Sequence, residues 1–145
     1  MAGTAIIEFA LIAGFFFMLM FSMLEIGILG WVSLTMQHAV REAARYAVTG
    51  RSDLDTSGRR YMAVIREIRN QSMGLYDMVS PTIVVNGTEY ADPSKYSAGM
   101  FGNPGELVVL QLNCRWPLLT PYIAPAFAGA TYRFSVAATM RNEQY

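Results

Sequence analysis

The sequence predicts an α+β fold: a long N-terminal helix, a second short helix and a small antiparallel β-sheet. Three observations support this prediction. Between Met1 and Val40 the only charged side chains are Glu8 and Glu25, so the chain begins with a very apolar segment. A polar, turn-rich stretch follows at residues 51–58. From about residue 80 the spacing of apolar residues changes from the helical period of 3.6 to the strand period of 2.

Composition excludes several classes of protein. The 145 residues make one ordinary domain, and 53% of them are apolar while only 15% are charged, against roughly 25% charged in an average soluble domain. Eleven basic residues balance eleven acidic ones, which argues against a nucleic-acid binder with a basic surface. Cys114 and His38 are the sole residues of their types, too few for a disulfide, a thiolate-rich zinc site or most catalytic sites. We therefore expect no enzymatic activity, no cofactor and no metal site.

The first element is predicted to be a retained membrane anchor. A hydrocarbon core of about 30 Å needs about 20 apolar residues in a helix, and residues 4–24 supply that length. A secretory signal peptide is the main alternative, but the basic start, the short apolar stretch and the cleavage site typical of one are missing. A buried core helix would need a larger protein around it.

The helical pattern continues beyond the anchor. We predict one helix from residue 4 to about residue 49, with its membrane part at about 4–30 and an amphipathic second half before the stop at Gly50. The expected buried face consists of Met36, Val40, Ala43, Ala44 and Ala47.

The remaining residues, 51–145, are predicted to form an α+β domain. A helix is expected at 59–73, and strands at 82–85, 106–116 and 132–141, with the hairpin signal Asn86-Gly87 after the first of them. Strict alternation places one side chain in two on the buried face of each long strand. These inward residues are Val108, Leu110, Leu112, Cys114 and Trp116, and then Tyr132, Phe134, Val136, Ala138 and Met140.

A cluster of arginines on the predicted second helix, Arg59, Arg60, Arg66 and Arg69, has two interpretations. It is either a solvated face or a contact for phospholipid headgroups. The sequence favours the solvated face.

The two carboxylates of the anchor are the candidate functional residues. A carboxylate in an apolar segment is costly and needs a partner or a function, unless it reaches water at the interface. Cleavage after Gly3 would create an α-amino group at Thr4, one helical turn from Glu8, on the same or a neighbouring subunit. Glu25 lies about 100° round the helix from Glu8, so it needs a different partner. We expect a polar group of a neighbouring helix.

Gly3, then Glu8-Phe9, then an unbroken apolar helix, resembles the processing site of type IV pilin-like proteins. More narrowly, two N-terminal segments are similar to TadE-like pseudopilins of the tight-adherence (Tad, Flp) pilus: GTAIIEFALIAGFFFMLMFSMLEIG and AVREAARYAVTGR. The C-terminal segment RWPLLTPYIAPAFAGATYRFSVAATMRNE is also similar to that family.

The resemblance implies a pilin-like fold and a division of the chain into three parts. Residues 1–3 are the remnant of a leader that a prepilin peptidase removes between Gly3 and Thr4, residues 4–50 are the long helix, and residues 51–145 are the extracytoplasmic domain. Glu8, Phe9 and Glu25 are expected to act in helix packing and assembly.

The function implied by the resemblance is that of a structural subunit, a minor pseudopilin for biogenesis of a Tad (type IVc) pilus. Its expected partners are other pilins or pseudopilins and the pilus assembly platform of the inner membrane. It would cross that membrane once, with the C-terminal domain in the periplasm, or at the cell surface after assembly. The alternatives are a membrane-anchored periplasmic binding or sensor domain without enzymatic activity, and a filament-forming pilin.

Overall fold

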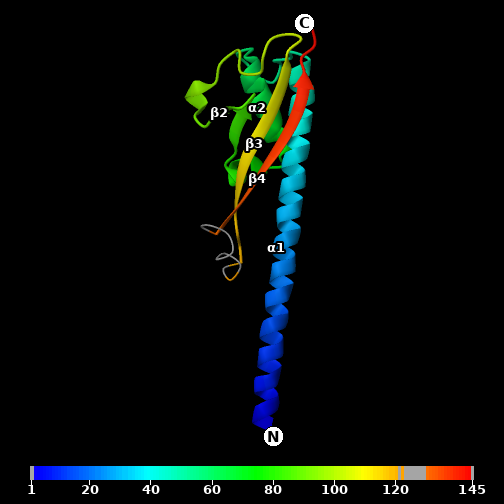
Figure 1. Ribbon diagram of the computed structural model, residues 1–145, viewed down its shortest axis with the longest axis vertical. Helices are drawn as coiled ribbons and strands as arrows, with labels where there is room; N and C mark the ends of the chain where they lie inside the picture. Colours follow the sequence, from blue (N-terminus) through cyan, green and yellow to red (C-terminus); the bar gives the residue numbers. More distant parts are fainter. Residues whose placement is uncertain (1, 121, 123–129, 145) are drawn as a thin grey trace. The chain divides into compact units, whose positions relative to one another are not determined.

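The computed structural model describes residues 2–120, 122 and 130–144, with side chains from Thr4 onward. The chain forms two compact units, one of residues 1–31 and 117–132 and the other of residues 32–116 and 133–145. Helix α1 (Ala2–Val48) is uninterrupted and contributes to both units (Figure 1). The predicted α+β fold with a long N-terminal helix is confirmed.

Helix α1 changes its surroundings along its length. Its large apolar side chains are exposed from Ile6 to Ile26, whereas in the second unit one side of the helix is buried. The buried residues include the whole predicted face: Met36, Val40, Ala43, Ala44 and Ala47. The spacing of apolar residues in the sequence therefore predicted correctly which face of the C-terminal half of α1 is buried.

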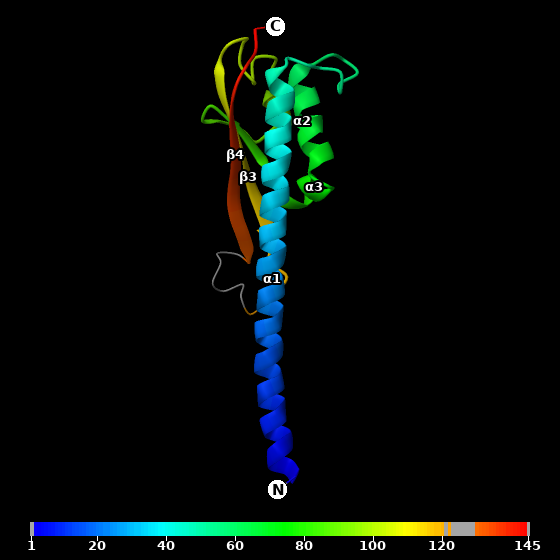
Figure 2. The same ribbon diagram turned by 90° about the vertical axis from the view of Figure 1, so that its right-hand side faces the viewer.

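The second unit contains the core. Its sheet has the strand order β2-β1-β3-β4, built from β1 (Thr82–Val85), β2 (Thr88–Tyr90), β3 (Leu107–Pro117) and β4 (Thr131–Arg141). Strand β1 pairs antiparallel with β2 and with β3. Helix α2 (Arg60–Gln71) and the C-terminal half of α1 lie on one face of this sheet, as Figures 1 and 2 show from two directions.

The registers of the long strands agree with the alternation in the sequence. All five side chains predicted to point inward from β3 are buried. In β4 the predicted face is also the more buried one, and Val136 and Met140 on it are buried. The other face of the sheet carries mainly polar side chains, as expected for a sheet covered on one side.

The hairpin between β1 and β2 turns at Asn86 and Gly87, whose φ angles are +50° and +81°. Two consecutive positive φ angles are typical of a tight hairpin turn, which Asn-Gly adopts readily. The Asn86 side chain also accepts a hydrogen bond from the Val109 N–H at 2.8 Å, which joins the turn to β3. The hairpin prediction is confirmed.

Helix α3 (Leu75–Val79) and a short 3-10 helix (Pro93–Lys95) were not predicted. The predicted second helix extended to residue 73, but α2 ends at Gln71 because Met73 and Gly74 turn the chain with φ angles of +52° and +83°. Five residues are too few for a helical period to be recognised in the sequence. Tertiary packing supports α3 instead, since Leu75, Tyr76 and Val79 are buried.

Candidate functional site: the N-terminal helix and its carboxylates

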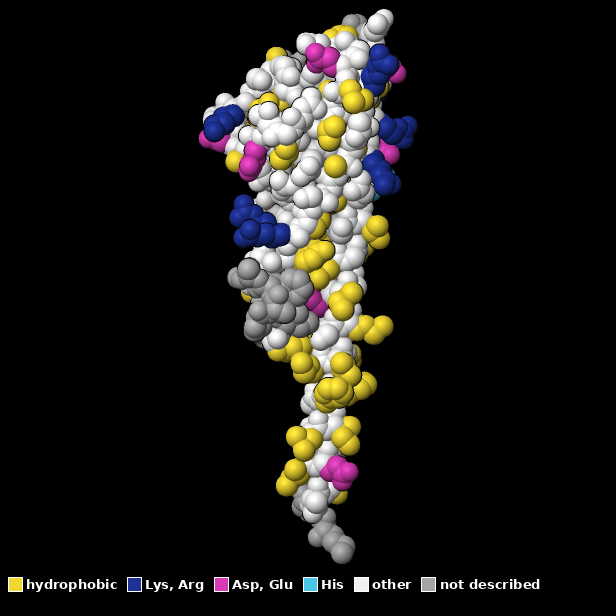
Figure 3. Space-filling model, viewed as in Figure 1, with side chains coloured by type: hydrophobic (Ala, Val, Ile, Leu, Met, Phe, Trp, Pro, Cys, Tyr) yellow, Lys and Arg dark blue, Asp and Glu magenta, His cyan; other side chains and the backbone are white. Residues whose placement is uncertain are grey.

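The first half of α1 presents a continuous apolar surface. Figure 3 shows hydrophobic side chains along this part of the helix. Phe9, Phe15 and Leu24, for example, have 73%, 64% and 56% of their surface exposed. Among the described residues, one helix is long and apolar enough to cross a membrane, and its most apolar window has a mean hydropathy of 2.2 with no residue buried. This helix fits a single-pass membrane protein. A buried core helix, the alternative considered from the sequence, does not fit this exposure.

The predicted processing site lies in the first turn of α1. Gly3 and Thr4 are consecutive helical residues, and the Thr4 side chain is exposed. The backbone nitrogen of Thr4 is a peptide nitrogen in this chain, so it offers Glu8 no charge.

Glu8 and Phe9 are both exposed on the apolar part of α1. Within the described part of the chain, the Glu8 carboxylate has no hydrogen bond or ion pair. A carboxylate among exposed phenylalanine, leucine and isoleucine side chains is poorly solvated in a membrane. Any partner that this carboxylate has must therefore come from outside the described residues of the chain.

Glu25 has a different environment. Its side chain is buried, with only 3% of the residue exposed. The backbone N–H of Leu119 donates to both carboxylate oxygens at 3.1 Å, and the Thr120 hydroxyl donates to the same carboxylate. The expectation that a neighbouring helix supplies this partner is therefore wrong, since the loop after β3 in the same chain supplies it.

Two further hydrogen bonds hold this loop. The Leu118 N–H donates to the Ala130 carbonyl at 2.9 Å, and the Tyr122 hydroxyl donates to the Met18 carbonyl at 2.7 Å. An apolar groove of about 430 Å³ lies between the loop and the helix, lined by Phe21, Leu24, Glu25, Ile28, Leu119, Thr120 and Tyr122. Residues 121 and 123–129, which follow β3 in the same loop, lie outside the described residues.

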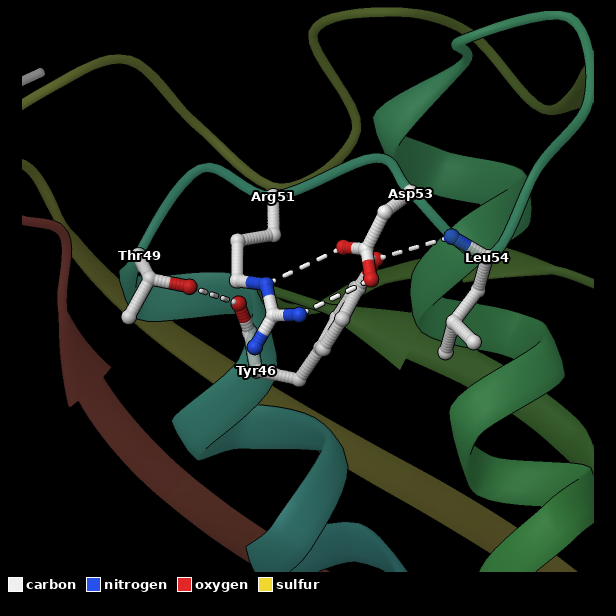
Figure 4. A network of polar contacts seen from close by, with 5 residues as sticks. All are labelled: Tyr46, Thr49, Arg51, Asp53 and Leu54. Carbon is white, nitrogen blue, oxygen red and sulfur yellow. Dashed lines mark hydrogen bonds and ion pairs between the residues drawn. The ribbon is translucent and has the colours of Figure 1, made fainter.

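A network of polar contacts lies at the C-terminal end of α1 (Figure 4). The Tyr46 hydroxyl donates to Asp53 at 2.9 Å, and the Arg51 guanidinium donates to the same carboxylate at 3.0 and 2.8 Å. These hydrogen bonds, chiefly those from Arg51, hold the pKa of the Asp53 carboxyl below its usual range. The network stabilises the turn that follows the helix.

Asp55, two residues later, is buried and pairs with two arginines. It accepts hydrogen bonds from the backbone N–H of Arg59 at 3.1 Å and from the Arg59 side chain at 3.2 Å, and Arg66 lies 3.7 Å away. Burial raises the pKa of Asp55, but the hydrogen bonds and positive charges outweigh burial, so the pKa is lowered overall. Among the described residues, no group of three or more His, Cys, Asp or Glu side chains could hold a metal ion.

The arginine cluster is engaged within the chain. Arg59 pairs with Asp55, Arg66 donates to the Leu54 carbonyl at 2.7 Å, and Arg69 pairs with Asp77 at 2.9 Å, all three from exposed positions. Arg60 differs, because its guanidinium points into the second unit. It donates to the carbonyls of Ala47 and Gly102 at 2.8 and 2.9 Å and to the Asn142 side chain at 3.0 Å.

The histidine and the cysteine of the chain have different surroundings. His38 is exposed on α1, and Cys114 is buried on the inward face of β3. Burial raises the pKa of the Cys114 thiol to about 12. A buried thiol with so high a pKa is a packing residue and a poor nucleophile.

A family model described as TadE-like protein matches residues 3–45, which cover the predicted processing site, the apolar surface and most of the buried face of α1. Comparisons with curated proteins and with solved structures gave no significant match. The N-terminal segment of the chain is therefore TadE-like, as its residues predicted.

Proposed function

We propose that the protein is a minor pseudopilin, a structural and non-enzymatic subunit for biogenesis of a Tad pilus that packs through its N-terminal helix. One observation carries this proposal. Within the TadE-like segment, α1 exposes apolar side chains from residue 4 to residue 24 and carries in that surface a carboxylate, Glu8, without a partner in the described chain.

The physical argument concerns the cost of Glu8 in a membrane. An acidic side chain in the middle of a membrane helix costs about 2.5–3.5 kcal/mol on insertion scales. Glu8 lies near the helix end, where this cost of insertion is smaller. Its carboxylate is still more stable in the membrane when a positive charge lies next to it. After cleavage at Gly3, the α-amino group of Thr4 on a neighbouring subunit supplies that charge, so pairing would set the axial position of one helix against the next.

The first test concerns processing by a prepilin peptidase. We expect the protein isolated from its native host to begin at Thr4 when its intact mass is measured. Gly3→Val should block cleavage, because a bulkier side chain does not fit a site that selects glycine. A mature protein that still contains Gly3 at its native N-terminus contradicts the proposal.

The second test concerns assembly. Glu8→Ala should insert at least as well as the native chain, because a charge is removed from an apolar helix, and the second unit should fold normally. Co-purification with other pilin-like subunits, or piliation, should be lost. Glu8→Gln keeps the shape of the side chain and removes its charge. This variant should also lose assembly if the charge of Glu8 is the required property.

The alternatives give different results in the same experiments. A membrane-anchored periplasmic binding or sensor domain uses the helix only as a tether, so Glu8→Ala would leave its function intact. A filament-forming pilin would be the abundant subunit of sheared pili, whereas a minor pseudopilin would remain largely with the cells. Protease digestion of spheroplasts tests the proposed orientation, since a periplasmic C-terminal domain is digested without lysis.

A further inference from the structure

We propose that the described residues of the loop after β3, 118–120 and 122, form a second membrane contact beside α1 and are held there by Glu25. Leu118, Leu119 and Tyr122 would contact the acyl chains of the leaflet in which the apolar part of α1 ends, while Thr120 is buried against Glu25. We call the hydrogen bonds of Leu119 and Thr120 to Glu25 the Glu25 clip.

The first argument is the orientation of polar and apolar groups in the loop. The Leu119 N–H, the Thr120 hydroxyl and the Tyr122 hydroxyl all donate toward the helix, and the Leu118 N–H donates within the loop. The Leu119 side chain, by contrast, is 66% exposed. A loop in water commonly turns polar groups outward, whereas a backbone segment in hydrocarbon must satisfy its polar groups internally and can expose apolar ones.

The second argument is the level of the loop along the helix. Residues 4–24 span about 30 Å at about 1.5 Å per residue, which matches the thickness of the hydrocarbon core. Glu25 directly follows this span, and Met18, which accepts the Tyr122 hydrogen bond, lies about 10 Å further toward the N-terminus. The loop therefore reaches the level of the last turns of the membrane span.

The third argument is that the apolar surface of α1 continues into the groove beside the loop. The groove between the loop and α1 is lined on the helix side by Phe21, Leu24 and Ile28, and Phe21 and Leu24 belong to the exposed apolar surface of α1. The sequence carries no charged residue between Arg115 and Arg133, so no charged side chain in this stretch opposes contact of its described residues with the bilayer. Tyrosine is enriched at membrane interfaces, where its hydroxyl lies among polar groups and its ring lies among apolar ones.

The clip explains why a second carboxylate is tolerated at the end of an apolar helix. A buried carboxylate needs donors, and the loop supplies a backbone N–H and a hydroxyl to it. Glu25 thus links an apolar loop to the helix, and Glu8 is left as the carboxylate available to another subunit. This inference rests on the membrane position of α1 and is independent of a role in the pilus.

The test places a fluorescent probe on the loop of the full chain. In a Cys114→Ala background, the environment-sensitive dye NBD is attached to Leu119→Cys, and for comparison to Thr88→Cys in the exposed hairpin. Each protein is reconstituted in vesicles of phosphatidylethanolamine and phosphatidylglycerol, with or without lipids spin-labelled on their acyl chains. We expect the probe at 119 to emit at shorter wavelength and to be quenched several-fold more than the probe at 88.

A probe at 119 that emits as in water and escapes the acyl-chain quencher overturns the proposal. If it becomes shielded only when other pilus subunits are present, the loop binds protein and the lipid assignment is wrong. Glu25→Ala tests the clip: quenching at 119 should fall while a probe at Phe16→Cys in the anchor stays quenched. Unchanged quenching at 119 in this variant would show that Glu25 does not hold the loop. Failure of Glu8→Ala to affect assembly would leave these results untouched.

Discussion

Replacing Arg60 with methionine should destabilise the second unit, because Arg60 connects three segments that are distant in the sequence. Its guanidinium donates to Ala47 near the end of α1, to Gly102 before β3 and to Asn142 after β4. Asn142 in turn donates to the carbonyls of Phe101 and Asn103 at 2.8 and 2.9 Å. Methionine preserves most of the apolar stem and removes these donors.

The expected loss follows from the hydrogen bonds to Ala47, Gly102 and Asn142, which are 2.8, 2.9 and 3.0 Å long. Hydrogen bonds that involve a charged group each contribute about 1.5–3 kcal/mol. Arg60 is only partly buried and its bonds are coupled, so the sum is reduced to about 3–5 kcal/mol. For a chain of this size that corresponds to a fall in Tm of roughly 10–15 °C.

The assay is thermal unfolding in detergent micelles, followed by near-ultraviolet circular dichroism. Arg41→Met is the matched control, since Arg41 is exposed on α1 and has no hydrogen bond or ion pair among the described residues. Arg60→Lys should fall between the native chain and Arg60→Met. A Tm change below about 2 °C in Arg60→Met, together with weaker binding to anionic vesicles, would refute the reasoning and favour the lipid-contact interpretation of the arginine cluster.

Three further predictions concern the same unit. Cys114, buried and with its pKa raised to about 12, should react with thiol reagents only after denaturation, and rapid labelling of the native protein would contradict the register of β3. Asp55 has a pKa lowered by its arginine partners, so its contribution to stability should be complete above the ordinary aspartate pKa near 4 and should be lost as the pH falls through the lower folded-state value. The Asp55→Asn variant should therefore be less stable at neutral pH and lose less on acidification, which denaturant titrations at several pH values would measure. Gly102→Ala should lower stability by about 1–3 kcal/mol, because φ is +69° there and a Cβ atom would lie 2.8 Å from Val108 and Glu106. Gly99→Ala, with nothing within 4 Å and no positive φ, should change stability little in the same unfolding experiment.

Local patterns in the sequence determined most of the architecture. The helical spacing from Met36 to Ala47 and the alternation along residues 106–116 each reflect burial on one side of one element, whereas the long apolar segment forms a surface that the chain leaves exposed. Asn86-Gly87 specified its turn because few residue pairs adopt two consecutive positive φ angles easily. Such signals lie within a few residues of one another, and they are therefore readable without the rest of the chain.

The tertiary structure alone decided which polar groups meet. The partners of Glu25 are 94 and 95 positions away, and Arg60 reaches Asn142 across 82 positions. Neither pair of partners can be predicted from the periodicity of the sequence, because a hydrogen bond between residues so far apart in the chain depends on how the intervening elements pack. The same reason explains why Glu25 was assigned a partner on another helix, although it bonds to the loop of its own chain. Patterns of burial are local properties of a sequence, whereas the pairing of buried polar groups is a property of the folded chain.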